Sequence, residues 1–207
     1  MDKLTAKITV DKLSRVFSDK PALEFNTPYQ LLVAVILSAQ CTDARVNKVT
    51  AELFKEYGTP EKMLTLSAED LGKMIFSCGL YKSKAEHILS ATADIMSKFG
   101  GNVPDNLEDL RTLAGVGRKT ANVVFSVAFG GDAIAVDTHV FRVSNRLGLV
   151  NEKDVLKTEL SLMEIIDKKS WRAAHHYLIY LGRSFCKAKN PDCEHCPVNK
   201  ECEKRIK

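Results

Sequence analysis

The chain has 207 residues, of which 45% are hydrophobic and 27% charged. These values are ordinary for a soluble globular protein, and the length suffices for a buried core in one large domain or two small ones. The net charge of +4 is compatible with a nucleic-acid partner, although basic surfaces have many other uses.

Nothing in the sequence predicts a membrane protein or a secreted one. The longest apolar run, Leu31 to Leu37, is far shorter than the roughly 18 residues of a membrane span. Residues Met1 to Leu4 lack the basic region and following apolar stretch of a signal peptide. We therefore expect a cytoplasmic protein with no membrane partner. Because thiols stay reduced there, its six cysteines indicate a metal or catalysis before disulfides.

Apolar residues recur at helical spacing along most of the chain, and no segment shows sustained period-two alternation between turn signals. Gly58 and the pair Gly100-Gly101 are typical helix ends. Ser67 to Asp70 resembles a capping box with Asp in the usual place of Glu or Gln. The sequence predicts an all-α protein with a break at Gly130-Gly131-Asp132. We expect helices over 29–39, 43–57, 83–99, 106–113, 118–129, 138–147, 152–167 and 170–185.

Four cysteines near the C-terminus form a C-x6-C-x2-C-x5-C pattern: Cys186, Cys193, Cys196 and Cys202. Their short, proline-containing spacers are typical of loops, so four thiolates could converge on one small metal centre. Structural zinc usually takes two close cysteine pairs, and only Cys193 and Cys196 form such a pair. The spacing therefore favours a [4Fe–4S] cluster, while zinc remains an alternative. Cys41 and Cys78 are expected to be small buried hydrophobic residues.

A second informative segment runs from Leu113 to Ala121 and contains Gly115, Val116 and Gly117. The two glycines allow a tight turn and leave backbone amides uncovered at the start of the next helix. Such amides favour anions, including phosphate, although glycine is also common in plain helix–helix turns.

Lys119 lies in the first turn of this next helix. Apolar residues at 121, 124, 125 and 128 mark the buried stripe of the helix, so Lys119 is predicted to project away from the core. A lysine nucleophile must be neutral, and the positive end of a helix dipole disfavours the ammonium form. The alternative is an ordinary solvated lysine, the commonest state of this residue.

These features together resemble endonuclease III, a family of bifunctional DNA glycosylases with AP-lyase activity in the helix–hairpin–helix superfamily. The hairpin, the segment from Val136 to Val140 and the cysteine tail carry the resemblance, together with the segments 37–40 and 79–81. It extends from about Thr27 to Cys202. One departure is Ala114, where the family usually has proline.

The resemblance implies base-excision repair of oxidised pyrimidines in double-stranded DNA, with a monomeric enzyme and one [4Fe–4S] cluster. The damaged nucleotide would be flipped out of the duplex. Lys119 would then attack C1′, displace the base and form a Schiff base that permits β-elimination at the abasic site.

Asp137 corresponds to the family's catalytic carboxylate. It also precedes a predicted helix and is a good N-cap. Both roles can coexist, and we favour a fixed negative charge beside a developing oxocarbenium ion over a proton acceptor.

Four further positions are expected to contact DNA. Gln40 would fill the space left by the flipped nucleotide, and Leu80 would wedge between bases. Lys187 and Lys189 would face phosphates, unless they belong to a solvated charge run.

The family's architecture implies two helical domains with the DNA cleft between them. A six-helix barrel containing the hairpin would span about 21–131. Residues 1–20 and 132–207 would form the iron–sulfur cluster domain.

Several alternatives stay open. A monofunctional adenine glycosylase of the superfamily is disfavoured because such enzymes lack the hairpin lysine, whereas a mismatch-specific thymine glycosylase is harder to exclude. From another class, the chain could be a non-catalytic iron–sulfur DNA-binding module, which would need neither Lys119 nor Asp137. A zinc-ribbon regulator is a more distant alternative.

Overall fold

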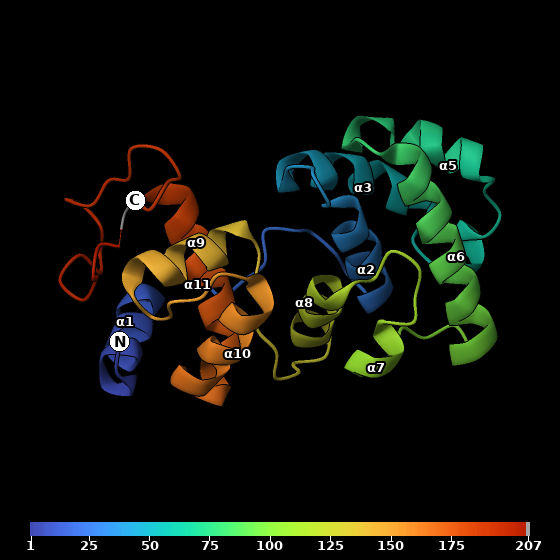
Figure 1. Cartoon of the computed structure of the whole chain (residues 1–207). Coiled ribbons are helices and arrows are strands. Elements are labelled where there is room, and N and C mark those ends of the chain that lie inside the picture. The colour runs from blue at the N-terminus through green and yellow to red at the C-terminus, as the bar shows by residue number, and fades with distance from the viewer. Residues whose placement is uncertain (206–207) are drawn as a thin grey trace. The chain divides into compact units, whose positions relative to one another are not determined.

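The computed structural model describes residues 1–205, and over these residues the protein is helical without a single strand (Figure 1). The predicted all-α class is therefore confirmed. No helix in this part of the chain is long and apolar enough to cross a membrane. The chain divides into two compact units, one formed by Pro21–Gly130 and the other by Met1–Lys20 together with the chain from Gly131 onward.

The unit Pro21–Gly130 is built around α2 (Pro28–Leu37). Every residue of α2 after Pro28 is buried, as expected for a helix in which Gln30 is the one strongly polar side chain. It packs against α3 (Asp43–Tyr57), α6 (Tyr81–Phe99) and α8 (Arg118–Ala128). The core of this unit therefore surrounds α2.

Shorter helices complete the same unit. α4 and α5 pack on α6, α7 packs on α8, and the 3-10 helix η1 contacts both α3 and α6. Their bounds are Pro60–Met63 for α4, Ala68–Met74 for α5, Phe76–Cys78 for η1 and Leu107–Leu110 for α7.

The other unit has α11 (Trp171–Ser184) at its centre, packed against α1 (Lys3–Ser14) and α9 (Thr138–Leu147). α10 (Val155–Ile165) packs on α9, and the 3-10 helix η2 (Lys168–Ser170) precedes α11. The N-terminal helix thus shares a core with helices more than a hundred residues later in the chain. Fully buried members of that core include Ala6, Leu13, Ile134, Val143 and Leu181.

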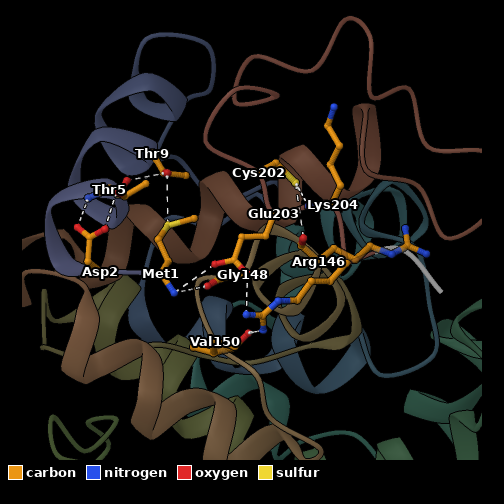
Figure 2. Close-up of polar contacts among 11 residues, drawn as sticks. Met1, Asp2, Thr5, Thr9, Arg146, Gly148, Val150, Cys202, Glu203 and Lys204 are labelled. Carbon is orange, nitrogen blue, oxygen red and sulfur yellow. Dashed lines mark hydrogen bonds and ion pairs between the residues drawn. The ribbon is translucent and has the colours of Figure 1, made fainter.

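The irregular segment after α11 is fastened to the end of α9 and to the N-terminus (Figure 2). The Met1 amino group donates to the Gly148 carbonyl at 2.8 Å and lies 3.4 Å from Glu203. The Cys202 thiol donates to the Arg146 carbonyl at 3.5 Å. These contacts hold the C-terminal cysteine segment against regular structure.

Most predicted helices are present with small differences at their ends. The predicted helix 43–57 is found with the same bounds, whereas that predicted over 152–167 begins only at Val155, because Asp154 is its N-cap and accepts from the Lys157 amide. The helix predicted over 106–113 ends at Leu110, after which the backbone continues in turns whose hydrogen bonds join residues three apart. The N-cap half of the predicted capping box is confirmed, because the Ser67 hydroxyl accepts from the Asp70 amide. The Asp70 carboxylate, however, accepts from the Ser67 hydroxyl in place of the Ser67 backbone amide.

Candidate functional site

The glycine hairpin joins α7 to α8 and is anchored by its apolar residues. Leu113 and Val116 are buried, and the Val116 amide donates to the Leu113 carbonyl at 3.1 Å. Gly115 has a φ of +74°, which L-residues with side chains rarely adopt. Since the Val116 side chain faces the core, only its backbone is available to a ligand.

The start of α8 is open to solvent on the hairpin side. Gly117 is the N-cap and provides no side-chain hydrogen bond to the first-turn amides, which lack helical acceptors. No atom lies within 4 Å of the position that a Cβ on Gly117 would occupy. A helix N-terminus of this kind, with uncovered amides, suits a phosphate group.

Lys119 is the second residue of α8 and its side chain is exposed. Ala121 and Val124 are fully buried, and Phe125 and Ala128 pack against the same core, so the predicted buried stripe is confirmed. Lys119 accordingly points away from the core at the solvent-open start of the helix.

Gln40 and Leu80 are both exposed and both have left-handed backbone conformations, with φ of 53° and 47°. Leu80 is 60% exposed and is one of several large apolar side chains that lie at the surface of the described residues. Left-handed backbone at residues other than glycine is strained and persists only where its surroundings enforce it. Both residues belong to the same unit as Lys119.

A buried lysine supports the two segments that carry Gln40 and Leu80. The Lys84 ammonium donates to the carbonyls of Leu37, Ala39 and Cys78 at 2.7 to 2.8 Å, and the residue is only 4% exposed. Sequence reasoning missed this residue. The available signal was a lysine in register with the buried stripe Ile88, Ala91 and Ile95 of α6.

The two cysteines outside the C-terminal cluster lie in these same segments. Cys78 is fully buried, as predicted, whereas Cys41 is half-buried. Burial, followed by the neighbouring Cys41 thiol, raises the pKa of Cys78 to about 11. Cys78 is therefore protonated at neutral pH and is an inert packing thiol.

Asp137 lies in the other unit and caps α9. Its carboxylate accepts a hydrogen bond from the Val140 amide at 2.8 Å, so the predicted N-cap geometry is confirmed. The segment before it is held by the buried His175, whose Nδ1 lies 2.6 Å from the Ala135 carbonyl. Burial is the main cause that lowers the pKa of His139. The Nδ1 atom of His139 lies 3.2 Å from Nη2 of the Arg142 guanidinium.

Cys186, Cys193, Cys196 and Cys202 line one small cavity, together with Arg146 and Leu147 from α9. All four thiols are free and half-buried. Burial is the largest cause that raises the pKa of both Cys196 and Cys202. Across residues 1–205, however, no three His, Cys, Asp or Glu side chains are arranged closely enough to form a ready metal site.

Two arginines of α9 fix the loop that follows the first of these cysteines. Arg142 donates to the carbonyls of Gly182 and Cys186, and Arg146 donates to those of Lys187 and Ala188. Lys187 and Lys189 are exposed on this loop, as the sequence predicted. The Lys204 amide points at the Cys202 sulfur at 3.2 Å, and such donors stabilise a thiolate.

Comparison with known proteins gives a consistent result. The model of the HhH-GPD superfamily of base excision DNA repair proteins matches residues 33–168. Endonuclease III of Bacillus subtilis is 49% identical over 195 residues, which cover 93% of this chain and 89% of the relative. The chain belongs to the endonuclease III family, and the resemblance seen in the sequence is confirmed.

Solved structures agree with this assignment. A trapped covalent intermediate of an endonuclease III with DNA is 46% identical, with a TM-score of 0.93 and coverage of 99% of this chain and 97% of that one. A thermostable thymine-DNA glycosylase is 26% identical, with a TM-score of 0.85 and coverage of 96% and 95%. The fold is thus shared with an endonuclease III and with a thymine-DNA glycosylase.

Proposed function

We propose that this base-excision repair enzyme removes oxidised pyrimidines from duplex DNA and nicks the resulting abasic site, with Lys119 as the nucleophile. The observation that carries the proposal is the exposed Lys119 amine in the first turn of α8, next to uncovered hairpin amides. A similar protein, 46% identical, forms a covalent intermediate with DNA. We expect the enzyme to act in the cytoplasm, where bacterial DNA lies.

The reaction follows from a neutral amine near a deoxyribose. The Lys119 lone pair bonds to C1′, and the glycosidic bond breaks with its electron pair leaving on the base, which takes up a proton. Opening of the sugar ring gives a Schiff base at C1′. Loss of a C2′ proton then expels the 3′ phosphate, and water hydrolyses the Schiff base to release Lys119.

Asp137 would serve this reaction as a fixed negative charge. Because its carboxylate already accepts the Val140 amide as the cap of α9, its orientation is set before substrate arrives. A preorganised charge stabilises a cationic transition state without reorganisation during the reaction. We therefore favour electrostatic stabilisation of the oxocarbenium-like sugar over proton transfer.

Binding of the flipped-out nucleotide would depend on backbone and exposed side chains. The amides around Gly115, Val116 and Gly117 would bind phosphate. Gln40 would occupy the space left in the stack, and Leu80 would wedge between bases. Their exposure and their strained backbone support this role.

The four C-terminal cysteines would hold a [4Fe–4S] cluster through four thiolates. The residues fit such a group, because four thiols line one cavity and donors from Arg146 and Lys204 face the sulfurs. The cluster would shape the loop that presents Lys187 and Lys189.

Protein purified anaerobically should contain about four iron atoms and four sulfides per chain. A Cys196→Ser variant should lose iron, and stoichiometric zinc in the wild type would contradict the assignment.

Borohydride trapping tests the catalytic proposal. Wild type, Lys119→Gln and the distant control Lys98→Gln are each incubated with a duplex containing one oxidised pyrimidine. Wild type and the control should give a covalent complex, whereas Lys119→Gln should give none while still binding the duplex. Failure of folded wild type to trap on this lesion and on an abasic site would overturn the proposal. Processing of a thymine mismatch alone would indicate the specificity of the thymine-DNA glycosylase relative.

A further inference from the structure

We propose that Lys84 is a positioning residue that locks the two helix-invading segments, 38–41 and 78–80, in one relative arrangement. Processing of duplex DNA would then depend on Lys84, although its side chain is too buried to touch DNA. The inference rests on the proposed roles of Gln40 and Leu80.

The three hydrogen bonds of Lys84 join segments that are far apart in sequence. Its Nζ lies 2.8 Å from the Leu37 carbonyl and 2.7 Å from that of Ala39, at the end of α2. It also lies 2.7 Å from the Cys78 carbonyl, at the end of η1. A lysine ammonium has three hydrogen-bond donors and no acceptor, so all three of its donors bond to these two segments.

Two of the bonded carbonyls set the backbone at the invading residues. The Ala39 carbonyl belongs to the peptide plane that joins Ala39 to Gln40, and fixing this plane restricts the φ of Gln40. The Cys78 carbonyl belongs to the plane that leads into Gly79 and then Leu80. Gln40 and Leu80 both need such restraint, because they hold φ of 53° and 47° without being glycine.

No other side chain provides this restraint among the interactions that the structure records for these carbonyls. Leu80 is the N-cap of α6 but makes no side-chain capping bond, and nothing lies within 4 Å of a Cβ position on Gly79. Without the ammonium, three carbonyls at the ends of α2 and η1 would lose their charged donor. The strained residues would then relax toward ordinary conformations.

The chemistry itself should not need Lys84. In a single-stranded abasic oligonucleotide the sugar is already accessible, so neither Gln40 nor Leu80 has a stack to invade. Lys84→Met removes the donors and the charge while keeping a similar shape. A displacement of about 1 Å at a positioning element can cost about a hundredfold in rate, so we expect a loss of that order on duplex.

The experiment measures Schiff-base trapping rates on duplex and single-stranded abasic DNA. Lys84→Met should lose about a hundredfold on duplex and change by less than about threefold on single strands. The control Lys98→Met removes an exposed lysine about 21 Å further along α6 and should change neither rate. Lys84→Arg, which keeps the charge and donors, should recover part of the duplex rate. Equal losses on both substrates, or no loss on duplex, would overturn the proposal.

Two further measurements separate the possible failures. If Leu80→Gly shows no duplex-specific loss, the proposed role of Leu80 fails whatever Lys84 does. If Leu80→Gly does show it, adding Lys84→Met should cause a smaller further loss than Lys84→Met causes in wild type, because only the Gln40 segment is then left for Lys84 to position. If Lys84→Met does not fold, amide hydrogen exchange of the DNA-free wild type tests the proposal instead. Protected amides at Cys41 and Cys78 support the proposal, and exchange as fast as in an unstructured loop contradicts it.

Discussion

Gly115 lies directly against His87 of α6: a Cβ on Gly115 would be 2.9 Å from the His87 Cβ. A spacing this close leaves no room for a side chain at Gly115 and places the hairpin, which we propose binds phosphate, beside α6. The same helix carries Lys84 and begins just after Leu80. The hairpin and the proposed wedge therefore share one rigid support.

Substitutions at the two hairpin glycines should have different effects. Gly115→Ala should lower the free energy of unfolding by about 1–3 kcal/mol, because it combines a φ of +74° with the His87 contact. Gly117→Ala has an ordinary φ and open space, so its stability should stay within about 0.5 kcal/mol of wild type. Its new methyl group should nevertheless weaken DNA binding where a phosphate approaches. Denaturant unfolding and duplex affinity test both variants; unchanged affinity of Gly117→Ala would argue against a phosphate at this turn.

Gln40→Gly should separate stability from function. Glycine adopts a φ of 53° without steric cost, so the free energy of unfolding should stay equal or rise by up to about 1 kcal/mol. Duplex processing should fall, because the side chain proposed to fill the vacated space is gone. Activity on single-stranded abasic DNA should persist. A variant that is less stable but fully active on duplex would contradict the role of Gln40.

Lys187 and Lys189 should contribute to the salt dependence of DNA binding. Changing both to alanine should reduce the slope of log affinity against log salt by about 2 units. The control pair is Lys55→Ala with Lys98→Ala, which removes two exposed lysines that form ion pairs near the ends of α3 and α6. An unchanged slope in the Lys187 and Lys189 variant would exclude phosphate contacts by these side chains.

His176 should make the protein sensitive to acid. Burial, with the neighbouring His175 and Arg172, lowers its pKa from 6.5 to about 3. The unfolded chain therefore binds a proton between these values and the folded chain does not, so stability falls as the pH drops below 6.5. From pH 6.5 to 4.5 the loss should be about 2 kcal/mol.

His176→Phe keeps a planar ring but cannot titrate, so it should remove that part of the pH dependence. Its stability at neutral pH should be equal or higher, because His176 Nε2 is buried without a hydrogen-bond partner among the described residues. An acid slope of wild-type size in His176→Phe would show that other groups cause it.

Sequence reasoning succeeded where local rules decide the structure. Gly58 and Gly100 end helices as predicted, and Asp137 caps α9 because a short carboxylate before a helix can reach the third amide. The exposed direction of Lys119 followed from the apolar spacing of α8. Motif order and spacing then led to the family, which the comparisons confirmed.

Long-range contacts lay beyond local rules. Nothing in the sequence near Lys84 shows that its ammonium reaches carbonyls 45 and 47 residues earlier. Likewise, no local sequence signal predicts the left-handed backbone of Gln40 and Leu80. Nor did the sequence show that the Val116 side chain packs inward, which leaves its backbone amide for the proposed phosphate contact.

Peptide mapping of the borohydride-trapped complex tests the central claim most directly. Wild-type protein is trapped on a duplex with one abasic site and digested, and the peptide that carries the sugar adduct is identified by mass spectrometry. We predict a single reduced adduct at Lys119. An adduct at another amine, such as the N-terminus, with Lys119 unmodified, would contradict the assignment of Lys119 as the nucleophile.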